Sequence, residues 1–507
     1  MALSGFAEKI YEYCTDRKLL VGVSCIVTGL SGGPDSVALI SVLSELAANK
    51  RDFPKLYAVH VNHGLRESAK DDEFLALSLA DKLGIPCKSY HYDVKAKAEE
   101  LGRGLEETGR ILRYEAFAEC ALEASKELGA ERESVKIATA HHKGDLAETF
   151  MMNLFRGTGL EGLTAMASDP GVIRPLLGVT KEEILSYLEE RGTAYATDET
   201  NLESDVTRNK WRNDIMPLIR EVSVKTPEDA VYDAYTLLSR DEDFISVTAS
   251  EAYKKCVVKE GKYLFAKADE VCALHPAVGT RVVRLLWEEV FGNLTDFETK
   301  HVDIVMDLMK LKDGTHYADM PFGRTAVVCG GLLGFCGEEG VTAVCCAMAT
   351  YMGFPAVPEA FAIHVSRDEL EEGAKTFELP DSDLVIRASV VENSEAIVYN
   401  TYSWICAEED LDIGVSPADG TIRKAGSPHN ADIRKMMSDL KVPRDAREHL
   451  IAVTSGGRIL WVPGLGHTDG FVSSKSRQKW LEQQSAPVKE MLIMLEVLRK
   501  EETGGQA

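Results

Sequence analysis

A short loop of glycine, serine, proline and aspartate interrupts an apolar run near the start of the sequence. Its residues are Ser31, Gly32, Gly33, Pro34, Asp35 and Ser36. Glycines permit a tight turn with positive φ, and the first N–H groups of a following helix attract an anion. A carboxylate beside bound oxyanions makes chemical sense when a divalent cation lies between them. The loop is therefore predicted to hold a magnesium-bound pyrophosphate through Asp35. An ordinary glycine-rich turn is the alternative.

The loop is not a Walker A loop, because the sequence contains no Gly-x-x-x-x-Gly-Lys-Ser/Thr. The run Ser-Gly-Gly-Pro-Asp-Ser instead resembles the signature of the PP-loop ATP pyrophosphatases. That family cleaves ATP between the α- and β-phosphates and transfers AMP to a substrate oxygen. The resemblance implies that ATP and Mg²⁺ are the cofactors.

A second group of polar residues recurs at every third position. His142, Asp145 and Glu148 follow an apolar run, 134–139, and a helix is predicted to open at about Lys143. On such a helix the three side chains gather near one face. Two carboxylates there could bind an ammonium group or a metal ion. The alternative is that both acids are favoured by the helix dipole alone.

Alternating strands and helices must position both groups. Strands are predicted at about 26–29, 55–62, 86–92 and 134–139, with helices from Pro34, over 70–84 and over 105–130. This alternation predicts an α/β fold with a doubly wound parallel sheet. Ligands bind such sheets at the carboxyl ends of the strands, where His63 follows the second strand.

The helix predicted over 105–130 carries four polar residues with a shared direction. Glu107, Arg110, Arg113 and Tyr114 have the spacing i, i+3, i+6, i+7, which keeps them near one face. They could present charge to one site or form an ion-pair ladder on the surface. Spacing alone favours the ladder.

Length and composition set the outer limits. A chain of 507 residues is too long for one core, so two to four domains are expected. The first twenty residues describe an amphipathic helix and lack the apolar core of a signal peptide, which predicts a cytoplasmic protein. Residues 341–358 are uncharged but interrupted by glycine and proline, so we expect buried strands there and no membrane partner. The eleven cysteines show no Cys-x-x-Cys spacing and predict buried free thiols.

Charge is distributed unevenly along the chain. The net charge of −24 argues against a nucleic-acid partner. Residues 421–482, however, carry 11 Lys and Arg against 6 Asp and Glu, on a predicted helix at 430–440, a turn and a strand. A basic module on an acidic body suits electrostatic docking, although ordinary solvated surface explains it nearly as well.

These residues together narrow the resemblance to one family. The chain is similar to the tRNA(Ile)-lysidine synthetases at 31–36, 62–66, 105–114, 140–142, 154–163, 174–177, 198–201 and 207–209. Residues 432–447 and 459–464 resemble the tRNA-contacting C-terminal module of that family. We therefore expect a PP-loop catalytic domain at 1–220, a mainly helical middle domain at 221–335, a β-rich connection at 336–383 and a C-terminal α+β domain at 384–507.

The family implies a two-step ligation on the wobble cytidine of tRNA(Ile) with a CAU anticodon. AMP is first transferred to the cytosine O2, and L-lysine then displaces it to form lysidine. Carried over to this sequence, the loop 31–36 with His63 and His142 binds ATP, and Asp35 binds the metal. Asp145 and Glu148 bind lysine, and the catalytic set is Asp35, Arg113, Asp145, Glu148 and Arg208. Lys435, Arg444 and Arg447 contact the tRNA. A homodimer is compatible with this resemblance, but the sequence does not determine it.

One departure from the family lies inside the site. The family has His-His-x-Asp-Asp where this chain has Gly144 in place of the first Asp. The missing carboxylate either binds a ligand or only caps the helix, a role that glycine replaces at small cost. Two other functions remain open: a PP-loop tRNA sulfur transferase, which the lack of Cys-x-x-Cys disfavours, and a non-catalytic tRNA-binding protein with a degenerate ATP pocket.

Overall fold

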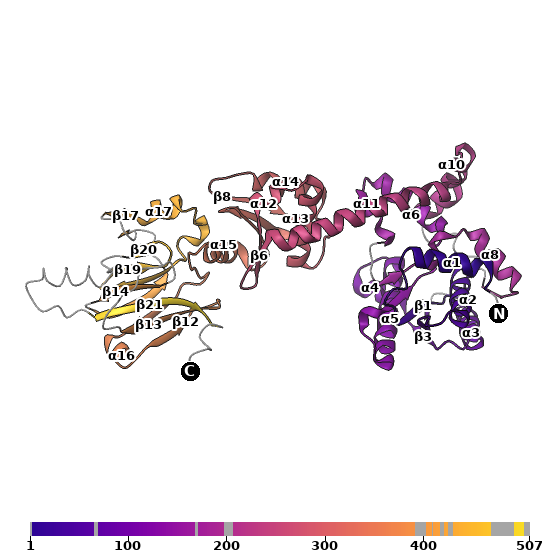
Figure 1. Ribbon diagram of the computed structural model, residues 1–507, viewed down its shortest axis with the longest axis horizontal. Helices are drawn as coiled ribbons and strands as arrows, with labels where there is room; N and C mark the ends of the chain where they lie inside the picture. Colours follow the sequence, from indigo (N-terminus) through magenta and orange to yellow (C-terminus); the bar gives the residue numbers. More distant parts are fainter. Residues whose placement is uncertain are drawn as a thin grey trace, which may run out of the picture. The chain divides into compact units, whose positions relative to one another are not determined.

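The computed structural model of the protein describes most of the chain (Figure 1). The described residues are 3–64, 69–167, 171–196, 206–390, 402–407, 409–415, 420–423, 429–467 and 491–500. Contacts divide the chain into two units, Met1–Asp243 and Phe244–Ala507, and the division falls within helix α11, Pro227–Cys256. The four domain ranges expected from the sequence stay a prediction.

Unit 1 is built on a five-stranded sheet with the order β3-β2-β1-β4-β5. Its strands are β1 Cys25–Gly29, β2 Lys55–Asn62, β3 Cys87–His91, β4 Val135–Ala138 and β5 Val172–Ile173. All neighbouring strands pair in parallel. The predicted parallel sheet is confirmed, and β1 lies at its centre because β2 and β4 pair on either side of it.

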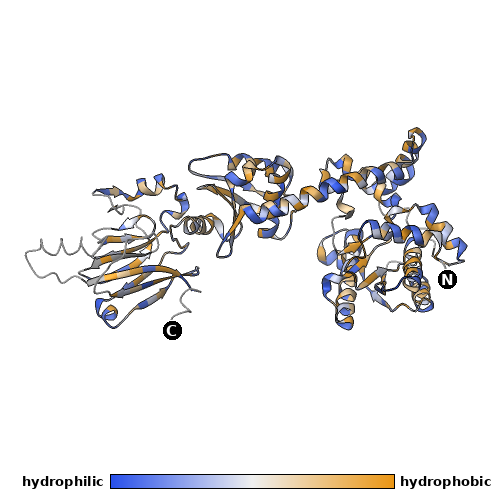
Figure 2. Cartoon of the chain, viewed as in Figure 1, coloured by the Kyte–Doolittle hydropathy of each residue, from blue (hydrophilic) through white to orange (hydrophobic). Residues whose placement is uncertain are grey.

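Helices cover both faces of this sheet. Ile26 of β1 packs in a core with helices α1 Gly5–Asp16, α2 Pro34–Asn49, α3 Ala69–Lys82 and α8 Lys181–Glu190. Its neighbour Val27 packs against α5, Leu105–Leu128, on the opposite face. Successive strand residues point to opposite faces, so an uninterrupted apolar strand must be covered twice. Figure 2 shows the matching hydrophobic and hydrophilic stripes on the covering helices.

A smaller core fixes the segment that follows the sheet. The remaining elements of unit 1 are α4 Val94–Leu101, η1 Arg132–Ser134, α6 Lys143–Arg156, α7 Leu160–Leu163, η2 Ala165–Ala167, η3 Pro175–Gly178, α9 Val206–Lys210, the π-helical turn η5 Trp211–Ile215 and α10 Met216–Val222. Leu146 and Phe150 of α6 pack with Met216 of α10 and with Val231 and Tyr235 of α11. This contact holds the segment α9–α10 beside α6.

Unit 2 is dominated by antiparallel sheets. The first has the order β6-β7-β10-β9-β8, the second β11-β15-β18-β19-β20-β16-β17 and the third β12-β13-β21-β14. The strands are β6 Val257–Glu260, β7 Tyr263–Lys267, β8 Thr315–Met320, β9 Arg324–Cys329, β10 Leu332–Cys336, β11 Ala362–Val365, β12 Lys375–Glu378, β13 Leu384–Val390, β14 Tyr402–Ala407, β15 Leu411–Val415, β16 Thr421–Arg423, β17 Asn430–Asp432, β18 Ile451–Ser455, β19 Arg458–Val462, β20 Gly466–His467 and β21 Met491–Arg499. The helical elements are α12 Ala268–Ala273, α13 Pro276–Phe291, α14 Thr299–Met309, η6 Pro321–Gly323, α15 Gly340–Tyr351, α16 Arg367–Glu371, α17 Ile433–Asp439 and η7 Arg444–Ala446.

The expectation of buried strands at 341–358 is wrong for most of that run, because α15 occupies Gly340–Tyr351. Residues 343–349 are all buried, so the helix is apolar on every side and shows no period in the sequence. Helix α15 shares a core with Phe265 and Val327 and with Ile433 and Val462. Residues on both sides of position 384 therefore build one core.

Two other expectations from the sequence concern membrane-spanning helices and free cysteines. No helix in the described ranges is both long and apolar enough to cross a membrane. Ten of the cysteines carry free thiols in the structure, and eight of these are buried, as predicted.

Candidate functional site

The serine- and glycine-rich loop connects β1 to α2. Gly32 has φ +92°, and a Cβ there would lie 3.3 Å from the backbone oxygen of Asp72. The Ser31 and Ser36 hydroxyls are 3.1 Å apart, and Ser36 Oγ donates to the Gly33 oxygen at 2.9 Å. Helix α2 starts at Pro34 with Gly33 as its N-cap, so no capping side chain covers its first N–H groups. The loop leaves these N–H groups available to an anion.

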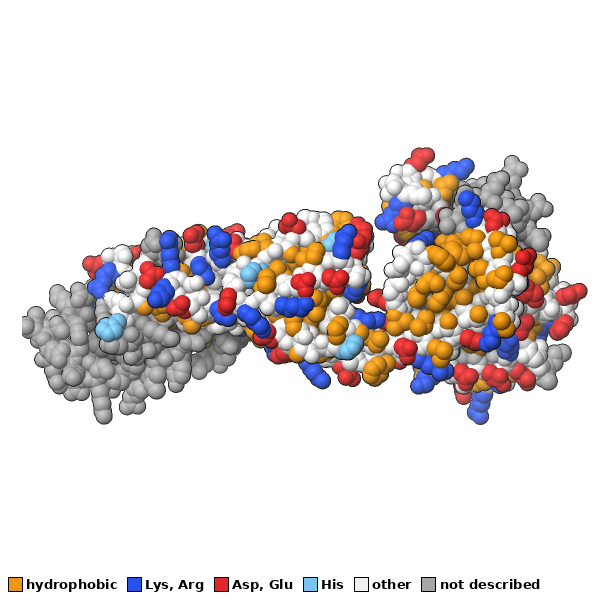
Figure 3. All heavy atoms as spheres, turned by 90° about the horizontal axis from the view of Figure 1, so that it is seen from above, with side chains coloured by type: hydrophobic (Ala, Val, Ile, Leu, Met, Phe, Trp, Pro, Cys, Tyr) orange, Lys and Arg blue, Asp and Glu red, His pale blue; other side chains and the backbone are white. Residues whose placement is uncertain are grey.

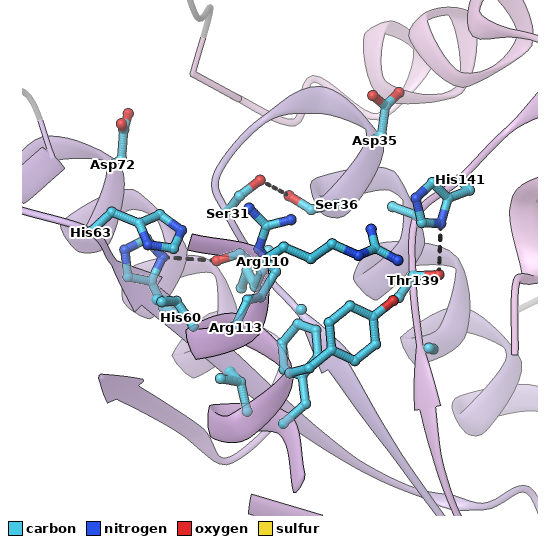
Figure 4. Close-up of a pocket in the computed structure, with 18 of the residues that line it drawn as sticks. Ser31, Asp35, Ser36, His60, His63, Asp72, Arg110, Arg113, Thr139 and His141 are labelled. Carbon is cyan, nitrogen blue, oxygen red and sulfur yellow. Dashed lines mark hydrogen bonds between the residues drawn. The ribbon is translucent and has the colours of Figure 1, made fainter. Parts of the chain in front are cut away.

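A cavity of about 510 Å³ opens beside this loop, at the carboxyl ends of β1, β2 and β4 (Figure 4). Helix α5 forms its other wall. Six residues predicted from the sequence line the cavity: Ser31, Asp35, Ser36, His63, Arg113 and Asp145. The loop residues Gly32, Gly33 and Pro34 lie between two of them in the chain. The volume is within the range of small-molecule sites.

Helix α5 turns two cations and an aromatic ring toward this cavity. Arg110, Arg113 and Tyr114 line it, and the Arg110 guanidinium lies 5.0 Å from the Tyr114 ring centre. Burial, followed by the nearby charge of Arg110, lowers the pKa of Arg113. Glu107 instead pairs with Arg103 at 2.6 Å. The predicted ladder among these four residues is therefore wrong: three of them line the cavity, and Glu107 pairs with a residue outside the set.

Two histidines that were not selected from the sequence also line the cavity. His60 donates from Nδ1 to the Leu30 oxygen at 2.8 Å. His141 Nδ1 lies 2.9 Å from Thr139 Oγ1, and burial lowers the pKa of His141 to about 4. The His141 ring is therefore neutral at pH 7. Its position directly after β4 was the available signal, because polar residues at that edge meet the ligand.

His142 links the loop to the acidic residues of α6. As the N-cap of α6 it accepts the Gly144 N–H at Nδ1, at 3.0 Å, while its own N–H donates to Asp145 at 3.0 Å. Its Nε2 lies 4.0 Å from Asp35 Oδ1 and 3.6 Å from Asp145 Oδ2. A Cβ on residue 144 would come within 2.7 Å of the His142 ring. Glycine at the position of the family's aspartate thus allows this ring placement.

Asp145 and Glu148 are held by two arginines. Arg208 donates to Glu148 at 2.9 Å and to Asp145 at 3.3 Å. Arg212 binds both oxygens of Glu148, at 2.6 and 3.0 Å. The Glu148 side chain is only 6% exposed, so two guanidinium groups balance two largely buried carboxylates.

The pKa shifts of this cluster follow from its contacts. Burial would raise the pKa of Asp145, but the neighbouring His142 and His141, the His142 N–H and Arg208 together lower it. The hydrogen bond that Arg212 donates to Glu148 raises the pKa of Arg212. Arg212 was not selected from the sequence, although its position four residues after Arg208 places the two on one helical face.

Asp35 contacts a lysine that the sequence did not single out. Lys181, the first residue of α8, lies 2.5 Å from Asp35 Oδ1. Within the described ranges, no group of three or more His, Cys, Asp or Glu side chains could hold a metal ion. Mg²⁺ at nucleotide sites is often held by one or two carboxylates, with phosphates and water as the other ligands. Asp35 fits a magnesium ion of that kind.

The residues predicted to contact tRNA lie in unit 2. Lys435 and Arg444 are exposed, on α17 and η7. Arg447 is half-buried and donates to the Val442 oxygen at 3.1 Å. Several residues on which the sequence argument also depended lie outside the described ranges: Leu65, Arg66, 198–201, Lys424, Lys475, Arg477 and Lys479.

The parallel sheet, the loop and the adjoining cavity define a PP-loop protein, and residues 4–219 match the family model of the PP-loop domain. Residues 411–483 match the model of the TilS substrate C-terminal domain. The chain belongs to the tRNA(Ile)-lysidine synthase family, which makes it a ligase with an ATP-binding domain.

Relatives of the same name cover both units of the chain. The tRNA(Ile)-lysidine synthase of Caldanaerobacter subterraneus is 29% identical over 481 residues, which cover 94% of this chain and 97% of the relative. That of Symbiobacterium thermophilum is 28% identical over 478 residues, 90% and 93% of the two chains. That of Clostridioides difficile is 33% identical over 313 residues, 61% of this chain and 65% of the relative.

Proposed function

We propose that the protein ligates L-lysine to carbon 2 of the wobble cytidine in a tRNA(Ile) with a CAU anticodon, through an adenylated cytidine. The observation that carries this proposal is that Asp145 belongs both to the cavity wall and to the acidic pair with Glu148. A nucleotide pocket and a site suited to an ammonium group thus share one residue. Family membership independently supports tRNA as the substrate.

In the first step, the cytosine O2 attacks the α-phosphorus of ATP and pyrophosphate leaves. The N–H groups and hydroxyls of the loop 31–36 hold the phosphates, and His63 and His142 flank the nucleotide. Magnesium held by Asp35 would neutralise charge on the departing pyrophosphate. Arg113, which lines the cavity together with Arg110, stabilises the negative charge that develops on the α-phosphate.

In the second step, the lysine ε-amine attacks carbon 2 and the bond from this carbon to the AMP oxygen breaks. Lysine is a nucleophile only as the neutral amine, so a carboxylate, Asp145 or Glu148, must accept a proton from it. Both carboxylates are engaged by Arg208 and Arg212. The lysine ammonium therefore competes with these guanidinium groups, and a displaced Arg208 becomes available to the phosphate of the leaving AMP.

The two alternative functions predict different products. A sulfur transferase needs a reactive thiolate, but no cysteine lines the described cavity, and burial raises the pKa of Cys25 to about 12. A non-catalytic tRNA-binding protein would release no pyrophosphate when ATP and tRNA are added. The absence of a cysteine from the described cavity therefore favours the ligase over the sulfur transferase, and pyrophosphate release separates the ligase from the non-catalytic protein.

The test uses the full-length protein, ATP, Mg²⁺, labelled L-lysine and a tRNA(Ile) transcript with the CAU anticodon. We expect label in the tRNA, with one AMP and one pyrophosphate released for each lysine incorporated. A transcript in which uridine replaces the wobble cytidine is the control and should remain unlabelled. Pyrophosphate release without lysine incorporation would contradict the second step, and the absence of both would overturn the proposed function.

A further inference from the structure

Two aromatic side chains, the exposed Phe155 and the half-buried Trp211, form a pair beyond the acidic pair. Phe155, near the end of α6, and Trp211, at the start of η5, have ring centres 5.3 Å apart and planes inclined by 40°. The Phe155 side chain is 72% exposed. Large apolar rings with this exposure form candidate contact sites when they cluster.

Phe155 of this aromatic pair lies on the same face of α6 as the acidic residues. Phe155 comes seven residues after Glu148, which places both on one face of the helix about 10 Å apart. Across from them, Trp211 directly precedes Arg212, which binds Glu148. The aromatic pair and the proposed lysine site are therefore built from the same two segments.

Cationic residues flank both rings in the sequence. Arg156 follows Phe155, and Trp211 lies between Lys210 and Arg212. Arg156 and Lys210 are exposed, and no carboxylate of the described ranges forms an ion pair with either. In a chain with a net charge of −24, this local excess of positive charge fits a polyanion.

We propose that Phe155 and Trp211 form a stacking platform for a nucleobase of the anticodon loop, beside the reacting cytidine. This inference rests on the proposed function. Unpaired bases stack on aromatic side chains while nearby cations meet their phosphates. Stacked nucleotides are about 3.4 Å apart, so a residue about 10 Å along the helix from Glu148 is within about three nucleotides of the reacting base.

The backbone at Trp211 supports a specific role for this residue. Residues Trp211–Ile215 form a π-helical turn between α9 and α10. Such turns are rare and occur frequently at functional sites. Here the turn carries both Arg212, which contacts Glu148, and Trp211, which contacts Phe155.

The test compares Phe155→Ala and Trp211→Ala with wild type in lysine incorporation and in direct tRNA binding. We expect KM and Kd for tRNA to rise about 5- to 100-fold, the range of losing one base–aromatic stack. KM for ATP should stay within about twofold, and Trp211→Phe should restore most of the affinity. Phe244→Ala is the matched control, because Phe244 is also 72% exposed but lies close in sequence to Asp241 and Asp243.

The outcomes separate the platform from the proposed function. If wild type incorporates lysine but both alanine variants bind tRNA normally, the platform is overturned while the function stands. If wild type incorporates no lysine but the variants lose tRNA affinity, the proposed ligase function is contradicted and the stacking platform is supported. Equal losses in Phe244→Ala would overturn the platform, as would variants that lose only self-association in sedimentation, because the rings would then face a second copy of the chain.

Discussion

The two units use charged side chains in opposite ways. In unit 1, two arginines face the acidic pair, and the carboxylates are largely withdrawn from solvent, with the Asp145 side chain 15% and the Glu148 side chain 6% exposed. In unit 2, Lys435 and Arg444 are exposed. Figure 3 shows Lys and Arg side chains interspersed with Asp and Glu over the described surface of unit 2.

This difference predicts two kinds of response to substitution. Charges that are buried and paired interact strongly, so the loss of one leaves its partners unsatisfied. Exposed charges are screened by salt, and each contributes a small share of long-range attraction. We therefore expect changes in unit 1 to stop a chemical step and changes in unit 2 to reduce affinity in a salt-dependent way.

The largest effect is expected for Asp35→Ala. Asp35 is the acidic residue of the loop that fits a magnesium ion, so adenylation should be abolished while tRNA affinity stays within a few fold. Pyrophosphate release measures the first property and filter binding the second. Asp71→Ala, which removes an exposed carboxylate of α3, is the control. Near-normal pyrophosphate release by Asp35→Ala would contradict the assignment.

Asp145→Asn should separate the two chemical steps. If Asp145 serves lysine, the variant forms adenylated tRNA that accumulates, or it needs a higher lysine concentration to react. Transfer of labelled AMP to tRNA, followed over time, measures this. Glu161→Gln, a change at an exposed acid of α7, should behave as wild type. A variant that fails before adenylation would instead identify Asp145 as a ligand of the nucleotide, whose cavity it also lines.

The combined change Lys435→Gln, Arg444→Gln and Arg447→Gln tests the exposed charges of unit 2. Each phosphate contact on duplex nucleic acid contributes about −0.9 to the slope of log affinity against log salt, so the slope should flatten by up to roughly 2 to 3 units. ATP-dependent chemistry should be unchanged at saturating tRNA. Lys300→Gln, at a lysine 66% exposed, is the control. An unchanged slope would mean that the tRNA does not contact these residues.

Point changes are preferable here to a deletion from residue 384. Residues 422–465 supply 10 of the 23 buried residues of a core that also includes Phe265 and Val327. A truncated chain would expose this core. A loss of tRNA binding by that chain could not be attributed to the missing basic residues.

The smallest effect concerns the pH dependence of stability. Burial lowers the pKa of His141 from 6.5 to about 4. As pH falls from 6.5 to 4, His141 is therefore protonated in the unfolded chain but not in the folded chain. This removes at most about 3 kcal/mol of stability across that window. Urea unfolding at pH 7.5 and 5 should show a weaker pH dependence in His141→Gln than in wild type. His364→Gln is the opposing control: the hydrogen bond to Asp412 raises the pKa of the exposed His364, so the loss of this histidine should make the pH dependence stronger. Identical behaviour of the two variants would contradict the role of burial.

Local patterns in the sequence were enough to predict much of unit 1. Strand and helix periods predicted the parallel sheet, and the loop 31–36 is a contiguous motif whose backbone dictates its own conformation. The spacing of His142, Asp145 and Glu148 predicted a helix opening at Lys143, and α6 begins there. Periodicity failed at α15, because a helix buried on all sides has no polar face to reveal its period.

What the sequence by itself determined is the set of groups carried on single elements: the loop, the acidic pair and the family signature. The tertiary structure alone decided which groups meet across elements. Lys181 reaches Asp35 across 146 residues and Arg212 reaches Glu148 across 64, while Arg110 and Arg113 line the cavity. Such pairings depend on how α5, α8 and the segment α9–α10 pack on the sheet and on α6. This packing depends on how many apolar side chains fit together, and the spacing of residues within one element does not reveal it.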